Sequence, residues 1–359
     1  MNILSIDGGG IRGIIPAVIL NYIEKGLQRQ SGNPNATLAD YFDLIAGTST
    51  GGILACFYLM PPNSSNSCYF ASEAIDMYAT RGAEIFDRKC MRKGIAKPKY
   101  HADGLEKVLK ECMGDVTLAD TRKNCLVTAY DVTERKAVFF TSPEARKYPH
   151  RNYLLRDVAR ATSAAPTYFE LAAIKSLGGA WSYLIDGAMF AGNPTMCAVV
   201  EALRHCERSE AIQSKTIRSE AIQSEVIQSE AIQSEAIQNP KISDLFIVSI
   251  GTGKEKEKLD HNRVKEWGAI GWARPLIDIL LSASGEVVDY QMRQIFARRD
   301  GACPVSTNNY VRLEPELRKA KPDMDDASKE NIRQLIDAGE CFVKDNAETL
   351  DEIVKQLRV

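Results

Sequence analysis

The sequence lacks the cysteine and histidine spacings that build metal sites or disulfide frameworks. It contains four histidines, and its nine cysteines are scattered and never spaced as CxxC. An odd number of irregularly spaced cysteines argues against both kinds of framework. Reduced thiols in a cytoplasm-like compartment fit the pattern better. We therefore expect neither a bound metal nor a disulfide scaffold.

Long apolar runs and a large net charge are also missing. No stretch reaches the length needed to span a bilayer, and the opening run NILSI is too short for a signal peptide and lacks a cationic start. The net charge of −2 argues against a dedicated nucleic-acid binder. We expect a cytoplasmic protein, with export by a non-classical route as the alternative.

The remaining composition is that of an ordinary globular protein, with 45% apolar and 26% charged residues among 359. Apolar spacing predicts an amphipathic helix over residues 14–27. Strands alternating with helices imply a parallel or mixed sheet covered on both faces. We expect a single domain over residues 1–359. The short apolar runs that we expect to be strands lie at 2–6, 42–46, 124–132, 136–142 and 244–253.

One segment, residues 209–238, departs from this pattern because it consists of six five-residue units such as SEAIQ. Five residues advance a helix by about 500°, so successive isoleucines lie about 140° apart and form no continuous seam. We expect an inserted, solvent-exposed arm that is helical or frayed. The alternative is a protein-interaction arm, whose partner the sequence does not identify.

The segment Gly47-Thr48-Ser49-Thr50-Gly51 has the form G-x-S-x-G and lies between the apolar runs FDLIA and GILACFYL. A serine at a sharp strand-to-helix turn needs small neighbours, because the backbone must bend there and expose the hydroxyl. The following helix directs its amide groups and the positive end of its dipole at the same point. In this context Ser49 is a candidate nucleophile.

Three consecutive glycines, Gly8, Gly9 and Gly10, follow the first apolar run. Such a loop between a strand and a helix can direct several N–H groups at one point, as an oxyanion hole requires. Arg12 either adds a positive charge there or braces the loop.

The same loop satisfies G-x-G-x-x-G from Gly8 to Gly13, which a dinucleotide-binding protein would also show. That fold requires an acidic residue about 20 positions later, at the end of a second strand. Glu24 is within range but lies inside the predicted helix. Nucleotide binding is therefore the weaker alternative.

A serine nucleophile needs a base, and no histidine stands at a strand end beside small residues. We interpret all four as surface imidazoles. Asp186 is better placed, because it follows the apolar run WSYLI and precedes Gly187 and Ala188. An aspartate in an isolated Asp-Gly pair usually caps a turn. Because the sequence also has a serine turn without a suitable histidine, we favour the role of general base for Asp186. The four histidines are His101, His150, His205 and His261.

The stretches DGGGIRG, GTSTG and DGA together resemble the patatin-like phospholipases. Further blocks, such as NATLADYFDLIAGTSTGGIL and ARATSAAPTYFE, are similar to the plant patatin type, and the resemblance covers nearly the whole chain except the repeat arm. It implies a three-layer α/β/α fold with a central, mostly parallel mixed sheet.

The resemblance also implies a mechanism. Ser49 would attack an ester carbonyl of a lipid, Asp186 would accept its proton, and the amides of Gly8, Gly9 and Gly10 would hold the oxyanion. An acyl-enzyme intermediate would then be hydrolysed without a cofactor or a metal. A storage or interaction protein on the same scaffold is the alternative function.

The lipid substrate that the resemblance implies would make the protein peripheral at membranes, and two segments bear on such contact. Residues 88–99 carry six cations, which an anionic surface would attract, although an ordinary solvated loop explains them equally well. The run WGAIGWARPLIDILL places apolar side chains at a helical spacing, and we expect most of them in the core. They are Trp267, Ile270, Trp272, Leu276, Ile279 and Leu280.

Overall fold

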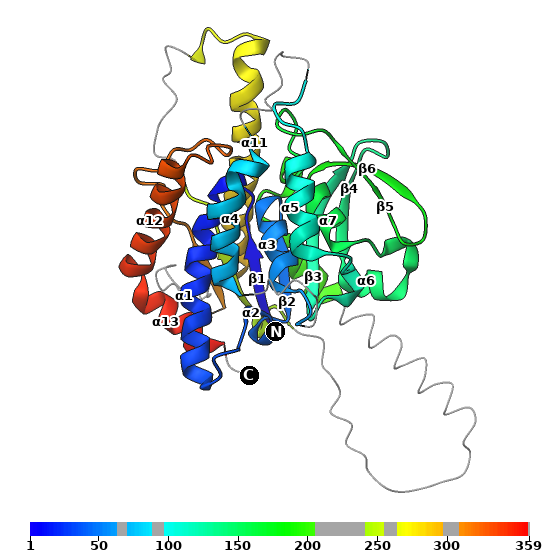
Figure 1. Ribbon diagram of the computed structural model, residues 1–359. Coiled ribbons are helices and arrows are strands. Elements are labelled where there is room, and N and C mark those ends of the chain that lie inside the picture. The colour runs from blue at the N-terminus through cyan, green and yellow to red at the C-terminus, as the bar shows by residue number, and fades with distance from the viewer. Residues whose placement is uncertain (63–69, 88–96, 205–240, 255–263, 297–308, 358–359) are drawn as a thin grey trace, which may run out of the picture.

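The structure is a computed structural model, and it describes residues 1–62, 70–87, 97–204, 241–254, 264–296 and 309–357 (Figure 1). Within these residues one sheet of eight strands has the order β5-β6-β3-β2-β1-β7-β8, and β4 pairs with β3. The strands are β1 (Asn2–Ile6), β2 (Leu44–Gly47), β3 (Asn124–Asp131), β4 (Lys136–Thr141), β5 (Ala172–Lys175), β6 (Trp181–Asp186), β7 (Phe246–Ile250) and β8 (Tyr310–Leu313).

The sheet is mixed and mostly parallel in its centre. Strand β1 pairs in parallel with β2 and β7, β2 pairs in parallel with β3, and β7 pairs in parallel with β8. Strands β4 and β6 run antiparallel to β3, and β5 runs antiparallel to β6. The predicted class of fold, an α/β protein with a mixed sheet, is confirmed.

Helices cover both faces of the sheet, because its central strands are apolar on both sides. The larger core lies between one face and α1, α3, α4, α5, α7, α12 and α13, and Figure 1 shows α12 and α13 beside α1. The smaller core lies on the other face, against α11 and a helix at 195–204. The longer helices are α1 (Ile14–Ser31), α3 (Thr50–Tyr58), α4 (Ala71–Ile85), α5 (Asp103–Met113), α7 (Leu155–Thr162), α11 (Ala269–Phe296), α12 (Lys329–Asp345) and α13 (Ala347–Gln356). Three shorter ones are α2 (Leu38–Tyr41), α6 (Ser142–Lys147) and α8 (Ala188–Ala191).

Adjacent residues of β1 show why the two cores exist. Ile3 belongs to the smaller core and Leu4 to the larger one, and both are fully buried. Successive side chains of a strand point to opposite faces, so an apolar run without polar alternation needs cover on both sides. This arrangement is the three-layer α/β/α architecture.

The elements predicted from the sequence are present, with small changes at their ends. Helix α1 extends beyond the predicted residue 27 to Ser31 and ends at Gly32, which has a left-handed conformation. Strands β5 and β8 have no counterpart among the predicted strands, because a charged residue in each, Lys175 and Arg312, leaves no continuous apolar run. The repeat arm at 209–238 lies outside the described residues.

Candidate active site

Strands β2 and β6 lie on the same edge of β3 and run toward each other. Residues of β3 pair with β4 along one edge over Leu126–Asp131, so its other edge pairs first with β2 and then with β6. Gly47 at the end of β2 is opposite Val127, and Asp186 at the end of β6 is opposite Ala129. The two strand ends, which are far apart in the sequence, therefore meet beside the same short stretch of β3.

The turn after β2 holds Ser49 in a strained conformation. Its φ of 54° and ψ of −124° are rare for a residue with a side chain, and such strain costs about 1–3 kcal/mol. The turn is also tight. A Cβ at Gly47 would lie 2.0 Å from the Gly51 carbonyl oxygen, and a Cβ at Gly51 would lie 2.1 Å from that of Ile6. Helix α3 begins at the next residue, Thr50, so its N-terminus faces Ser49.

Asp186 lines the same pocket as Ser49, and an interaction with the Ser49 side chain lowers the pKa of Asp186. It is buried, and its Oδ1 accepts the Ala188 N–H at 2.8 Å, so it also caps the turn that follows β6. Burial raises the pKa of Asp186 from 3.8 to about 7, and it outweighs the lowering effects of the Ser49 side chain and the Ala188 N–H. A carboxyl group with this pKa can take up and release a proton near neutral pH.

Gly187 and Gly13 must be glycines because neighbouring threonine side chains come too close for a Cβ. A Cβ at Gly187 would lie 2.2 Å from the Thr128 hydroxyl oxygen, and a Cβ at Gly13 would lie 2.2 Å from that of Thr50. The Thr48 hydroxyl bonds Thr128 and the Ala191 carbonyl, each at 2.7 Å. These contacts join the serine turn to the turn after Asp186.

The glycine loop differs from the prediction at its first residue. The Gly8 N–H donates to the Gly192 carbonyl at 3.0 Å, so it is not directed at an oxyanion as predicted. Gly9 and Gly10 line the same pocket as Ser49. Arg12 braces the loop, because its Nε donates to the Gly9 carbonyl at 3.3 Å.

Ser49 and Asp186 lie in a pocket that opens to solvent. Its lining is mainly apolar, which suits the hydrocarbon part of a ligand. The apolar side chains that line it include Ile53, Ile85, Phe86, Leu105, Phe169 and Met324.

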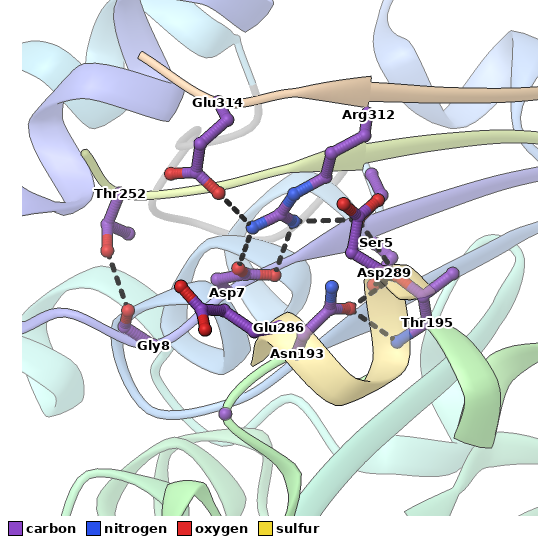
Figure 2. Close-up of polar contacts among 12 residues, drawn as sticks. Ser5, Asp7, Gly8, Asn193, Thr195, Thr252, Glu286, Asp289, Arg312 and Glu314 are labelled. Carbon is purple, nitrogen blue, oxygen red and sulfur yellow. Dashed lines mark hydrogen bonds and ion pairs between the residues drawn. The ribbon is translucent and has the colours of Figure 1, made fainter. Parts of the chain in front are cut away.

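Sequence reasoning missed the residues that hold the two loops from neighbouring elements. The Thr162 hydroxyl accepts the Ser49 N–H at 2.8 Å. Arg312 on β8 bonds both carboxylate oxygens of Asp7, the residue before the glycine loop, and the Thr252 hydroxyl donates to the Gly8 carbonyl (Figure 2). No local pattern marks these residues, since each acts on a segment distant in the sequence.

The predictions for the histidines and for Glu24 can be compared with the structure. His101 and His150 are exposed, as predicted, whereas His205 and His261 lie outside the described residues. Glu24 lies inside α1 and accepts the N–H groups of Leu38 and Ala71. It therefore does not stand at a strand end, where a ribose-binding carboxylate would be needed.

The segments considered for membrane contact are described only in part. Residues 88–96 lie outside the described residues, and Lys99 forms an ion pair with Asp325. Trp267 and Trp272 are half-buried and pack edge to face. Ile279 is 36% exposed, which corrects the expectation that it lies in the core; the side chains of Ile270, Leu276 and Leu280 are outside the described part. Among the described residues, no helix is both long and apolar enough to cross a membrane.

The fold and the site together define an α/β protein with a serine on a strained strand-to-helix turn beside a buried aspartate. A family model described as Patatin-like phospholipase matches residues 4–199, and the chain belongs to this family.

Curated relatives match almost the whole chain. Patatin-like protein 2 of Oryza sativa subsp. indica is 31% identical, over 98% of this chain and 85% of its own. Patatin-like protein 2 of Arabidopsis thaliana is 32% identical, over 96% of this chain and 83% of its own. A Solanum tuberosum protein named Probable inactive patatin-3-Kuras 1 is 31% identical, over 99% of this chain and 91% of its own.

Proposed function

We propose that this protein hydrolyses carboxylic esters of membrane lipids, with Ser49 as nucleophile and Asp186 as general base. The observation that carries the proposal is that a serine on a strained turn and a buried aspartate with a raised pKa line the same apolar pocket. Membership of the patatin-like phospholipase family supports a lipid as the substrate.

Acylation begins when Ser49 attacks the ester carbonyl and its proton passes to Asp186. A serine hydroxyl is a weak nucleophile until a base removes its proton. The raised pKa of Asp186 matches this task, because it lies close to the working pH. Asp186 then returns the proton to the leaving alcohol, which leaves an acyl group on Ser49.

The tetrahedral oxyanion needs donors on the side of Ser49 that faces the glycine loop. The amides of Gly9 and Gly10 are the donors that we assign to it, since both residues line the pocket. The N-terminus of α3 adds a favourable dipole. Water activated by Asp186 then hydrolyses the acyl-enzyme, and no metal takes part in any step of this proposal.

The apolar side chains of the pocket are suited to an acyl chain. Ile85, Phe86, Leu105 and Phe169 line it at a distance in sequence from the serine turn. Each buried methylene of a chain contributes about 0.8 kcal/mol of transfer free energy. A long-chain ester should therefore bind more tightly than a short one.

The proposal is tested with a fluorogenic acyl ester and phospholipid vesicles on wild type, Ser49→Ala and Asp186→Asn. Both variants should lose at least about 1000-fold in kcat, because removing any member of such a catalytic unit disables it. A fluorophosphonate should label Ser49 in the wild type, as read by mass spectrometry.

Asp120→Asn is a matched control for Asp186→Asn. The Asp120 carboxylate also caps a turn, through the N–H and hydroxyl of Thr117, but it does not line the pocket. Its variant should keep full activity. Equal turnover by wild type, Ser49→Ala and Asp186→Asn would reject the proposed function.

A further inference from the structure

The peptide between Gly8 and Gly9 is held by a residue from another strand. Thr252 lies two positions after the end of β7, and its hydroxyl donates to the Gly8 carbonyl at 2.7 Å. Thr252 is 5% exposed, so this hydrogen bond is shielded from water. Figure 2 shows the Thr252 side chain directed at Gly8.

The orientation of this carbonyl determines that of the next amide. A trans peptide unit is planar, and its C=O and N–H groups point in opposite directions. Because the Gly8 oxygen faces Thr252, the Gly9 N–H faces away from Thr252. Gly9 lines the pocket that contains Ser49.

A second contact acts in the same way on the following peptide. The Gly9 carbonyl accepts the Arg12 N–H at 3.2 Å and the Arg12 Nε at 3.3 Å. The Gly10 N–H therefore points away from Arg12. Holding two successive carbonyls orients two successive N–H groups.

Thr252 also explains why residue 9 is a glycine. A Cβ at Gly9 would lie 2.2 Å from the Thr252 hydroxyl oxygen and 2.6 Å from its Cβ. The loop start is fixed by β7 as well, since the Asp7 N–H donates to the Ile250 carbonyl at 3.0 Å. The segment after β7 thus packs directly on the glycine loop.

We propose that Thr252 is a positioning residue, which turns the Gly9 N–H toward the oxyanion by holding the Gly8 carbonyl. This inference rests on the proposed function. Thr252 lies beyond residues 4–199, the part that the family model matches, so the oxyanion site is completed by the C-terminal part of the chain.

The test compares Thr252→Val, which removes the hydroxyl at nearly constant volume, with Thr252→Ser, which retains it. Losing one oxyanion donor costs about 100- to 1000-fold in kcat, and a misdirected donor costs less. Thr252→Val should lower kcat about 10- to 100-fold with KM within about twofold. Thr252→Ser should restore most of the wild-type kcat.

Thr141→Val is the matched control. Thr141 is buried, and its hydroxyl has no hydrogen-bond partner among the described residues. Its variant makes the same chemical change without releasing a loop carbonyl and should keep the wild-type kcat. A trifluoromethyl ketone, which forms an oxyanion adduct, should bind Thr252→Val more weakly in proportion to the loss in kcat.

A wild-type kcat in Thr252→Val, a rise in KM alone, or an equal loss in Thr252→Ser would overturn the inference. Hydrogen exchange of the peptide that contains Gly8 and Gly9 gives a readout independent of turnover, and it should be faster in Thr252→Val than in Thr141→Val.

If the wild type neither hydrolyses esters nor reacts with a fluorophosphonate, the proposed function fails. Unchanged exchange would then overturn the role of Thr252 as well. Thr252→Ala replaces Thr252→Val if the latter does not fold.

Discussion

Arg312 and Asp7 form a two-point ion pair, with guanidinium nitrogens 3.0 and 2.5 Å from the two carboxylate oxygens. The Arg312 side chain is 5% exposed and also contacts Glu314 (Figure 2). It donates a further hydrogen bond to the Ser249 hydroxyl. Asp7 directly precedes the glycine loop. The pair therefore anchors the start of the loop to β8.

Removing Arg312 should destabilise the fold strongly. Arg312→Met leaves the Asp7 carboxylate buried without its cation, and breaking a buried pair from one side costs about 3–5 kcal/mol. The double variant Asp7→Asn/Arg312→Met should recover part of this loss. Urea unfolding measures the free energy of unfolding of both variants.

Arg333→Met is the control for Arg312→Met. Arg333 pairs with Glu330 on the surface, where the two side chains are 70% and 63% exposed. Such a pair contributes about 0–1 kcal/mol. An equal loss in the free energy of unfolding for Arg312→Met and Arg333→Met would contradict the importance of burial.

The activity should depend on the ionisation of Asp186. Only the carboxylate form accepts the Ser49 proton, and the pKa of Asp186 is raised to about 7 by burial. We expect kcat/KM to rise about tenfold per pH unit below about pH 7 and to level off above it. Initial rates with a soluble ester across the range from about pH 5 to about pH 9 test this. A flat profile through the neutral range would contradict it.

Ionisation of Glu24 should make the folded protein less stable as the pH rises, whereas the activity should increase over the same range. Burial raises the pKa of Glu24 from 4.5 to about 7, so the folded state binds its proton more tightly than the unfolded state. Its contribution is fully present below pH 4.5 and is lost as the pH rises through about 7. Glu24→Gln should flatten this part of the dependence, measured as the free energy of unfolding in urea. If the free energy of unfolding of Glu24→Gln has the same slope against pH as that of the wild type, the prediction is refuted.

Gly51→Ala should disrupt the serine turn. The added Cβ would lie 2.1 Å from the Ile6 carbonyl oxygen, and a backbone atom cannot move aside as a side chain does. Overpacking of this kind costs about 1–3 kcal/mol or more. Gly268→Ala, where a Cβ meets nothing within 4 Å, is the control in a thermal melt. Equal melting temperatures for both variants would show that the turn tolerates the change.

The sequence by itself determined the elements whose signal is local. The apolar run at 2–6, the helix that begins at Ile14 and the small residues around Ser49 are recognisable because period and turn chemistry act over a few residues. The motif order also indicated which serine and which aspartate to consider. Short strands such as β8 carried no such signal.

Only the tertiary structure decided how these segments meet. Strands β2 and β6 run toward each other on one edge of β3, which brings Ser49 to Asp186. It also showed that the Gly8 N–H is used by Gly192 and that Thr252 holds the Gly8 carbonyl. These contacts join residues that are far apart in the chain, and their geometry follows from strand pairing and packing, which no local pattern encodes.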